Sequence, residues 1–507
     1  MKVMSASPNL GAVFESISPA EFFYRNRQMA GFGNPSQAVY STVRELVENS
    51  LDACEDALCS PKIQIHIASD RPKTLTVTVT DNGPGLPYTE VPQAFGKVLY
   101  GSKYDQRQRR GTFGLGVTMA VLYGQITTDS LVEIETQTDE KPGRVFRLLV
   151  DVEQNEPFVE CEDRIQRSSN GTTVSICLKG DLKRAQDRII DYLRLTTIGT
   201  PHARIEYKSD DEKFVVGPWT SELPPLTRPS KPHPRAVDME LLRRLISISE
   251  DKTLHSFLVD SFQQIGIRTA SKFLALLGHT NKTRISALSR QELARLSNAM
   301  RSYAGFGKPD STCLSPIGEA PFMKGVASIF NTSFQRYIRS GIFEWEGNPI
   351  LLEGVLAIGD SFPSADIPTL FRFANRVPLL YDANEDALTK ATRKIRWSRY
   401  GVSKPQPIAL FLNLSSTRIP YKAAGKQSIA STMEIENEAL SLLRALGRGL
   451  GKSLGAGKAA VRFAKKKREF SEMIGIVAKY GSALADHEKI PSTGPIVKKL
   501  FDVVNHD

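Results

Sequence analysis

Apolar residues recur at every second position in two early segments, residues 62–68 (KIQIHIA) and 74–80 (TLTVTVT). A period of two is typical of strands with one buried face. A helical pattern over about residues 37–58 precedes them, and the runs LVEIETQ, RVFRLLVD and TTVSICLK follow. Because helices and strands are interleaved in this way, we predict a layered α/β sandwich for residues 1 to about 220.

A proline-rich segment separates this unit from the rest of the chain. Residues 224–234 (PPLTRPSKPHP) hold five prolines in eleven positions. Proline fixes φ and lacks an amide hydrogen, so the segment is predicted to be a stiff linker. We predict a small helical domain after it, because helical patterns follow at about 237–249, 253–264, 266–278 and 287–302.

A second α/β unit is predicted from about residue 318 to 432, with strand patterns in FEWEGNPILLEGVLAIG and PIALFLNLSS. A long basic helical pattern then closes the chain from about residue 433. It contains five glycines between Gly447 and Gly457. Each weakens a helix by about 1 kcal/mol relative to alanine, and the sequence gives no reason for them.

Composition excludes several classes of protein. The 507 residues are 41% hydrophobic and 24% charged, as in an ordinary globular protein with room for two to four domains. No apolar run reaches the roughly 18 residues that cross a bilayer and no signal pattern begins the chain, so we expect a cytoplasmic protein. The five cysteines lack CxxC spacing and histidine partners, which argues against a metal site or disulfide framework. The net charge of +11 favours a polyanionic partner.

One helical face carries the first candidate chemistry. In ELVENSLDA, the residues Glu45, Glu48, Asn49 and Asp52 are spaced i, i+3, i+4 and i+7, so they share a face. An amphipathic helix with a solvated acidic stripe gives the same pattern. The alternative is a catalytic face, on which a carboxylate deprotonates a water and an amide oxygen one turn away holds Mg²⁺. The helix alone does not decide between the two.

Two glycine-containing segments favour the catalytic alternative. DNGPGLP (81–87) follows a predicted strand and has the composition of an ordinary turn. Its glycines also let the backbone approach a flat ligand closely. The Asp81 carboxylate is suited to accept a hydrogen bond from the exocyclic amine of adenine. RRGTFGLGVTMAVLYGQ (109–125) is a glycine-rich loop that enters an apolar helix, a natural cradle for phosphate. Its GxxGxG spacing fits neither the dinucleotide fingerprint nor the P-loop.

In this order, the three segments resemble the GHKL family, which includes gyrase, Hsp90, MutL and histidine kinases. The resemblance implies a Bergerat α/β sandwich, with Glu45 as general base, Asn49 as Mg²⁺ ligand and Asp81 as adenine-binding residue. The other nucleotide contacts that it implies are Asp52, Gly83, Gly85, Ser102, Lys103, Gly111, Thr112, Phe113, Gly114, Leu115, Gly116, Val117 and Thr118.

Later blocks narrow the resemblance to the family of topoisomerase VI B subunits. They include SPAEFFYRNRQMAGF (18–32), RFANRVPLLYD (372–382) and STRIPYKAAGK (416–426), and similar blocks extend over most of the chain. The likeness implies an α/β multidomain protein whose parts are a GHKL ATPase domain with an N-terminal arm (1–225), a helix-two-turns-helix domain (228–305), a transducer similar to ribosomal protein S5 domain 2 with a stalk helix (306–470), and a C-terminal segment (471–507).

By this resemblance the chain is the ATP-binding and hydrolysing subunit of a type IIB DNA topoisomerase, with ATP and Mg²⁺ as ligands. ATP would join two copies, the arm around residues 5–25 crossing to the partner, and the closed dimer would capture double-stranded DNA. Cleavage would belong to a separate A subunit in an A₂B₂ assembly, docked on the stalk or the C-terminal segment. Lys426 would reach the γ-phosphate; a solvated loop lysine is the alternative.

The sequence departs from the family pattern in several places. Thr118 stands where a lysine is expected, and losing a hydrogen bond to a charged group, about 1.5–3 kcal/mol, predicts weaker nucleotide binding. Ser398 and Arg418 also replace lysines, and LKGDLKR (178–184) is only partly like the family's basic loop. These three changes bear on DNA contacts or coupling, not on hydrolysis.

DNA contacts are expected on several segments. SFQQIGIRTASKFL (261–274) resembles the turn and helix of nucleic-acid-binding helical hairpins, although a packing turn has the same pattern. Arg444, Arg448 and Lys452 form a basic stripe on the C-terminal helix, for which a solvated face is the alternative. The residues predicted to contact DNA are Lys179, Lys183, Arg184, Arg268, Lys272, Trp397 and Arg399.

Two other functions stay open at this point. One is a non-hydrolysing DNA-binding scaffold of the same family, of the meiotic-break type; Thr118 favours it, and the intact Glu45, Asn49 and Asp81 oppose it. The other is a MutL-like repair ATPase, which the helical insert after Pro234 and the block 372–382 oppose.

Overall fold

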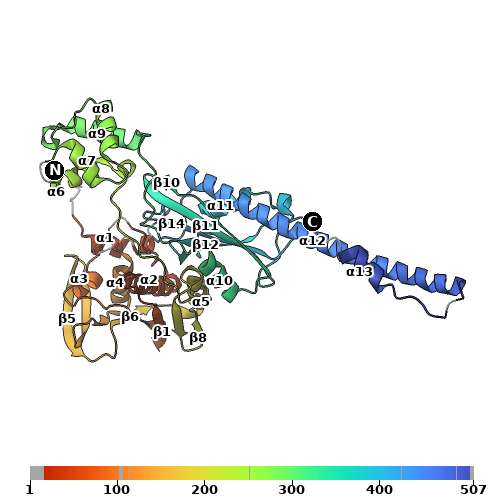
Figure 1. Ribbon diagram of the computed structural model, residues 1–507. Helices are drawn as coiled ribbons and strands as arrows, with labels where there is room; N and C mark the ends of the chain where they lie inside the picture. The colour runs from red at the N-terminus through yellow and green to blue at the C-terminus, as the bar shows by residue number, and fades with distance from the viewer. Residues whose placement is uncertain are drawn as a thin grey trace, which may run out of the picture.

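The computed structural model describes residues 16–101, 107–111, 114–249, 252–423, 425–486 and 488–502. They form an N-terminal unit (residues 16–216), a helical unit (234–302) and a third unit (from residue 319), each with its own apolar core, and a long C-terminal helix projects from the third (Figure 1). None of the helices within these ranges combines the length and hydropathy that a bilayer crossing requires.

The N-terminal unit is an α/β sandwich. Its strands are β1 (Lys62–Arg71), β2 (Thr74–Thr80), β3 (Val132–Gln137), β4 (Gly143–Asp151), β5 (Glu156–Ile165), β6 (Gly171–Lys179), β7 (Arg204–Lys208) and β8 (Lys213–Val216). They form one sheet in the order β5-β4-β3-β6-β2-β1-β7-β8, in which β1 and β7 are parallel. The alternation predicted for β2 is confirmed, because Leu75, Val77 and Val79 are buried and the threonines between them are half-buried.

Helices cover one face of this sheet (Figure 1). They are α1 (Pro19–Arg25), η1 (Arg27–Ala30), α2 (Pro35–Asp56), α3 (Val91–Gly96), α4 (Gly116–Thr128) and α5 (Leu182–Gly199). Helix α2 begins at Pro35 because Asn34 Oδ1 accepts a hydrogen bond from the Gln37 amide at 2.9 Å, and proline suits a first helical position. The predicted helix at 37–58 is therefore confirmed, with both ends two residues earlier.

Residues 217–233 contain neither helix nor strand and lead into the helical unit. This unit consists of η2 (Pro234–Ala236), α6 (Met239–Ile248), α7 (Leu254–Ser261), α8 (Ile267–Leu276), η3 (Ile285–Ala287) and α9 (Arg290–Ser302), so the four predicted helices are confirmed. Phe257, Phe262 and Phe273 fill its core. Ser289 starts α9 with a capping box to Glu292, which satisfies two backbone amides at the helix start.

The third unit is also α/β. Its elements are α10 (Glu319–Ile329), β9 (Phe334–Arg339), β10 (Phe343–Trp345), β11 (Asn348–Ile358), β12 (Thr369–Ala374), β13 (Val377–Pro378), η4 (Ala383–Glu385), α11 (Ala387–Lys394), η5 (Trp397–Tyr400) and β14 (Ile408–Ser416). The sheet order is β10-β11-β14-β12-β13, and β9 also pairs with β11. Strands β11 and β14 are buried on both faces, which explains their continuous apolar sequences.

The N-terminal and third units pack closely through α5 and α10. Leu195 and Ile198 of α5 share one core with Phe322 of α10 and with one face of the β11–β14 pair. A Cβ atom on Gly199 would lie 2.1 Å from the carbonyl oxygen of Arg376. The two backbones therefore meet at a point that only glycine allows.

Helix α12 (Met433–Leu484) is 52 residues long, about 78 Å at 1.5 Å per residue. Its first part packs on the third unit and its remainder projects away (Figure 1). Helix α13 (Gly494–Asp502) folds back against the projecting part, where Phe501 packs on Phe463 and Phe470.

The structure explains three of the glycines in α12. A Cβ atom on Gly447 would lie 2.7 Å from the ring of Tyr400, and one on Gly449 would lie 3.2 Å from the side chain of Arg336. Gly451 also faces Tyr400, at 3.4 Å. The glycines thus let α12 lie close to η5 and β9, and this packing offsets their poor helix propensity. Gly455 has no neighbour within 4 Å, and nothing in the structure explains it.

Candidate nucleotide site

The predicted catalytic face of α2 is buried. Glu45, Glu48 and Asp52 are 8%, 1% and 6% exposed, and Asn49 is half-buried. The solvated acidic stripe is therefore wrong for this helix. A carboxylate is buried in a protein only where positive charges or hydrogen-bond donors surround it. The partners of each residue therefore indicate the function of this helix face.

Glu45 lies against the N-terminus of α4. A Cβ atom on Gly116 would be 1.7 Å from Oε2 of Glu45, so this carboxylate occupies the space that any side chain at position 116 would need. Arg44 Nη2 donates a hydrogen bond to Oε1 of Glu45 at 2.6 Å. The amides at a helix N-terminus favour negative charge. The candidate general base and the helix entered by the glycine-rich loop thus meet at one point, which suits a phosphate group beside an attacking water.

Asp81 is held at the end of β2 with 9% exposure. The amides of Gly83 and Thr172 donate to its Oδ1 at 2.9 and 3.2 Å, and Ser50 Oγ donates to Oδ2 at 3.0 Å. Burial raises the pKa of this carboxyl, although the Gly83 amide acts in the opposite direction. Each carboxylate oxygen accepts about two hydrogen bonds. Oδ2 can therefore take one further donor, as the exocyclic amine of adenine requires.

Glycines shape the turn around Asp81. Gly85 has a φ of +75°, and a Cβ atom there would lie 2.3 Å from the carbonyl oxygen of Gln137. Gly171 has a φ of +136°, and its Cβ atom would lie 2.1 Å from the carbonyl oxygen of Asp81. Gly171 was not predicted, because an NG pair before a strand is the signal of an ordinary turn. Both glycines let neighbouring backbone segments approach closely, which keeps the Asp81 carboxylate in this position.

The start of α4 holds several predicted phosphate-binding residues. Gly114, Leu115, Gly116 and Val117 lie at its N-terminus, where Gly114 has a φ of +62°. The Gly111 amide lies 3.5 Å from Oδ2 of Asp52. The predicted contacts Ser102, Lys103, Thr112 and Phe113 lie outside the described residues.

Thr118 is the third residue of α4. Its side chain is 1% exposed, and its hydroxyl lies 3.5 Å from the carbonyl oxygen of Lys97. The side chain is therefore buried here, and the contact of Thr118 with the nucleotide stays a prediction. A lysine here would place an ammonium group in the protein interior, and burial without a partner disfavours that charge.

Lys426 reaches into the N-terminal unit from the third unit. Its Nζ donates a hydrogen bond to the carbonyl oxygen of Arg110 at 3.0 Å and lies 3.9 Å from Oε2 of Glu48. Next to it, Arg44 Nη1 donates to the carbonyl oxygen of Gly425 at 3.0 Å. Lys426 is 8% exposed, so the solvated loop lysine is wrong. Burial raises the pKa of Glu48 to about 7, against the opposing charge of Lys426.

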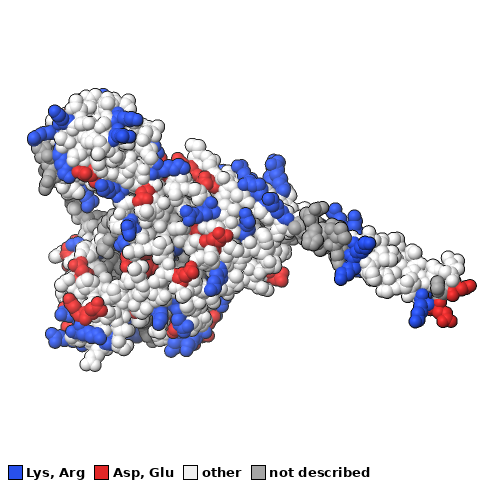
Figure 2. Space-filling view, viewed as in Figure 1, with Lys and Arg blue, Asp and Glu red and all other residues white. Residues whose placement is uncertain are grey.

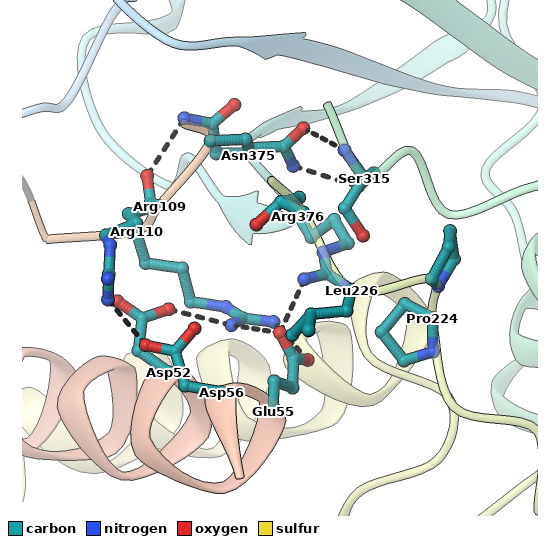
Figure 3. Close-up of a pocket in the computed structure, with 13 residues that line it drawn as sticks. Asp52, Glu55, Asp56, Arg109, Arg110, Pro224, Leu226, Ser315, Asn375 and Arg376 are labelled. Carbon is teal, nitrogen blue, oxygen red and sulfur yellow. Dashed lines mark hydrogen bonds and ion pairs between the residues drawn. The ribbon is translucent and has the colours of Figure 1, made fainter. Parts of the chain in front are cut away.

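A buried ionic cluster joins the two units at the other end of α2 (Figure 3). Arg110 pairs with Asp52 at 3.0 Å and with Glu55 at 2.9 Å, and Arg376 of the third unit pairs with Glu55 at 2.5 Å. His202 Nε2 lies 3.0 Å from the same Glu55 carboxylate. Burial raises the pKa of Glu55, but the positive charges of Arg110 and Arg376 outweigh it and hold this pKa well below its usual range. The carboxylate is therefore ionised.

The cluster borders a cavity of about 30 Å³, which Pro224 and Leu226 of the linker help to close (Figure 3). The cavity is far too small for a nucleotide, and Glu45 does not line it. Asp52 faces this joint between the units, because Arg110 engages its carboxylate. Asp52 also accepts from the Gly111 amide at 3.5 Å, and its contact with the nucleotide stays a prediction.

The predicted DNA-binding residues are spread over all three units. Lys179, Lys183, Arg184, Arg268, Lys272 and Arg399 are exposed. Trp397 is 3% exposed, and its indole Nε1 donates to the carbonyl oxygen of Thr392 at 3.2 Å. The prediction that Trp397 contacts DNA is therefore not supported, because its ring belongs to the core of the third unit. Figure 2 shows Lys and Arg side chains over the helical unit and along α12.

Several residues of these sites were not predicted. Ser50 and Thr172 lie within the motif ELVENSLDA and the strand TTVSICLK, where their side chains look like ordinary polar positions. Glu55, Arg110 and Arg376 give no local signal, since their partners are distant in the sequence. Only the block RFANRVPLLYD marked the neighbourhood of Arg376 as unusual.

Two family models match the chain. The model described as "Histidine kinase-, DNA gyrase B-, and HSP90-like ATPase" matches residues 34–181, which include Glu45, Asp81 and Gly116. The model described as "Topoisomerase VI B subunit, transducer" matches residues 309–467, which include Arg376 and Lys426. The transducer model thus covers Lys426 and Arg376, and the ATPase model covers the residues that these two side chains contact.

The chain is also similar to curated proteins that are named as the B subunit of type 2 DNA topoisomerase 6. The relative from Saccharolobus shibatae is 40% identical over 462 residues, 90% of this chain and 87% of the relative. A relative from Saccharolobus islandicus gives the same values. The relative from Saccharolobus solfataricus is 38% identical over 508 residues, 97% of this chain and 95% of the relative. The similarity thus covers both the ATPase and the transducer.

Proposed function

The chain belongs to the family of topoisomerase VI B subunits, the ATPases of type IIB topoisomerases, and we propose that ATP bound between α2 and α4 drives its action on DNA. The observation that carries the proposal is the contact between Glu45 and the N-terminus of α4. It brings a base and a phosphate cradle together at one place.

Glu45 is the general base of this proposal. A water attacks the γ-phosphorus, its proton passes to the Glu45 carboxylate, and the bond between the γ-phosphorus and the β-phosphate oxygen breaks. The position of Glu45 supports this role, because Arg44 holds Oε1 at 2.6 Å and thereby fixes the carboxylate. The positive end of α4 stabilises the phosphate charge that develops beside it.

Asn49 fits the role of Mg²⁺ ligand. It is half-buried one turn after Glu45 on the same helix, and its amide oxygen is a donor that this hard cation accepts. When bound, the ion neutralises phosphate charge. Asp81 selects adenine through its free acceptor position on Oδ2, and its other hydrogen bonds keep it in place.

Lys426 couples the site to the transducer. Its ammonium group is already buried in the ATPase, where it contacts a carbonyl oxygen and lies near Glu48. With ATP bound, this group would turn to the γ-phosphate, a stronger acceptor because it is charged. Hydrolysis and phosphate release would then change how the transducer sits on α2.

We assign the parts of the chain as a GHKL ATPase domain (1–225), a helix-two-turns-helix domain (228–305), a transducer with a fold like ribosomal protein S5 domain 2 (306–470) and a C-terminal segment (471–507). ATP joins two copies, and the dimer captures double-stranded DNA. An A subunit cleaves DNA in an A₂B₂ assembly; the exposed Met473, Val477, Tyr480 and Leu484 on the projecting part of α12 support docking there. Residues 5–15 of the arm lie outside the described residues.

The proposal is tested with the full chain and three variants. We expect the wild type to hydrolyse ATP, to dimerise with a non-hydrolysable ATP analogue and, with an A subunit, to relax supercoiled DNA when ATP is present. Glu45→Gln should still dimerise with the analogue but should lose hydrolysis, and Asp81→Asn should lose ATP binding. Glu160→Gln, an exposed glutamate on β5, is the control. A wild type that neither binds ATP nor dimerises would refute the proposal.

A further inference from the structure

The transducer holds helix α2 at two separate places. One lies beside the catalytic face, where Arg44 and Glu48 meet the Gly425–Lys426 loop. The other is the ion pair between Glu55 and Arg376. Glu45 and Glu55 are ten residues apart on one helix, which corresponds to about 15 Å at 1.5 Å per residue. Any movement of the transducer relative to the ATPase must therefore change one of these contacts or both.

The hold at Arg376 is a buried network of charges. Glu55 is shared by Arg110 at 2.9 Å and Arg376 at 2.5 Å, and Arg110 continues to Asp52 at 3.0 Å. Separating these buried charges would leave a carboxylate uncompensated, which is strongly unfavourable. At the other place, Lys426 Nζ donates a hydrogen bond to the backbone carbonyl of Arg110 and stands 3.9 Å from Glu48. A long, flexible lysine side chain can leave such contacts more easily.

Arg376 is also built into a tight two-residue hairpin turn. Asn375 and Arg376 have φ values of +49° and +70° and connect β12 to β13. Left-handed backbone is uncommon for arginine, and such strain gathers at functional sites. The Arg376 amide donates to Asn413 Oδ1 at 3.0 Å, which fixes the turn to the transducer sheet. On its other side the turn touches the backbone of Gly199.

The same turn holds the segment that leads into the glycine-rich loop. Asn375 Nδ2 donates to the carbonyl oxygens of Arg109 and Ser416, each at 2.9 Å. Nearby, Gln108 Nε2 donates to the carbonyl oxygen of Ser315 at 2.9 Å. Side chains and backbone of the transducer thus fix residues 108–110 of the ATPase from one small region.

We propose that the Asn375–Arg376 turn is the pivot on which the transducer moves over α2, and that Arg376 is a positioning residue for coupled ATP hydrolysis. The inference rests on the proposed function, since it concerns how hydrolysis at Glu45 is passed to DNA. The ion pair to Glu55 stays closed while the Lys426 end of the contact changes. Without the pivot, ATP still binds and is hydrolysed, but the transducer no longer moves in a fixed direction.

The test compares Arg376→Met with a matched control inside the transducer. Arg372→Met removes another buried arginine, which pairs with Asp386 at 3.0 Å and donates hydrogen bonds to the carbonyl oxygens of Leu379 and Tyr381, all within the transducer. Each full-length variant is combined with an A subunit, and ATP turnover and DNA relaxation are measured together. For Arg376→Met we expect a KM for ATP close to the wild-type value and a fall of about tenfold in DNA relaxed per ATP consumed. Arg376→Lys should recover part of the loss, and Arg372→Met should keep the wild-type ratio.

Wild-type coupling in Arg376→Met would overturn the inference, and so would an equal loss of coupling in Arg372→Met. If Arg376→Met does not fold, Asn375→Ala replaces it, because this change removes the hydrogen bond to the carbonyl oxygen of Arg109 without leaving a buried charge. The same ratio then decides. A wild type that fails to hydrolyse ATP or to relax DNA refutes the proposed function instead. The two failures are therefore distinguishable.

Discussion

Lys426 Nζ of the transducer donates a hydrogen bond of 3.0 Å to the carbonyl oxygen of Arg110 in the ATPase. The two residues are 316 positions apart in the sequence. The bond ties the transducer to the segment just before the glycine-rich loop. A lysine held this way is buried and positioned before any phosphate arrives, so little side-chain entropy remains to be lost when its partner changes.

Replacing Lys426 should slow hydrolysis more than it weakens binding. We expect Lys426→Met to lower kcat by about 100-fold, the typical effect of losing a donor to charge that develops in the transition state, with a small change in KM. Steady-state ATPase assays measure both constants. Lys422→Met is the control, because the ammonium group of Lys422 forms its ion pair with the exposed Glu385. Equal kcat values in the two variants would argue against a catalytic contact.

Adding one methyl group at position 116 should disable the site. A Cβ atom on Gly116 would overlap Oε2 of Glu45, so Gly116→Ala must displace the general base. We expect ATP hydrolysis to fall by about 100-fold or more, since a misplacement of 1 Å can cost that much, while the far-ultraviolet circular dichroism stays unchanged. Gly341→Ala, in the third unit, where nothing lies within 4 Å of the added atom, should retain full activity. Full activity in both variants would contradict the position of Glu45.

Glu48 should make stability depend on pH. Burial raises its pKa to about 7, so between its ordinary pKa and 7 the folded chain binds a proton that the unfolded chain does not. The stability that the protonated Glu48 contributes is complete at low pH and is lost as the pH rises through 7. Glu48→Gln cannot ionise, so its free energy of unfolding should rise relative to wild type from pH 5 to pH 8. Urea unfolding at several pH values measures this difference, and a constant difference would contradict it.

Two glycines of α12 should respond to alanine in opposite ways. Gly447→Ala would drive a Cβ atom to 2.7 Å from the Tyr400 ring and should destabilise the chain, whereas Gly475→Ala has no neighbour within 4 Å. The second change should stabilise the helix by about 1 kcal/mol, the difference in propensity. Thermal unfolding followed by circular dichroism compares them. A stabilising Gly447→Ala would show that α12 does not pack on η5.

The exposed cations of α8 should contribute to DNA binding through phosphate contacts. We expect Arg268→Ala and Lys272→Ala each to reduce the slope of the logarithm of the DNA-binding constant against the logarithm of the salt concentration by about 0.9. This is the value for one phosphate contact on duplex DNA. Fluorescence anisotropy with a labelled duplex over a range of salt measures the slope. Lys213→Ala, on the edge strand of the ATPase sheet, should leave it unchanged. Unchanged slopes for both α8 variants would remove this helix from the DNA surface.

The sequence by itself determined much of the architecture. Period-two alternation in β2 and helical spacing in ELVENSLDA depend only on neighbours in the chain, so they predict which face is buried. Local patterns also marked the three motifs whose resemblance to the GHKL family assigns Glu45, Asp81 and Gly116 to one nucleotide site. They also predicted the stiff linker and the four helices after it.

The tertiary structure decided which side chains that are far apart in the sequence become partners. Thr118, Asp52 and Trp397 occupy motif positions, yet the structure turns them toward Lys97, Arg110 and Thr392. The glycines of α12 make sense only beside Tyr400 and Arg336. Glu55 and Arg376, separated by 321 positions, form one ion pair. Local periodicity reports burial, but the partner that compensates a buried charge depends on packing across the whole fold.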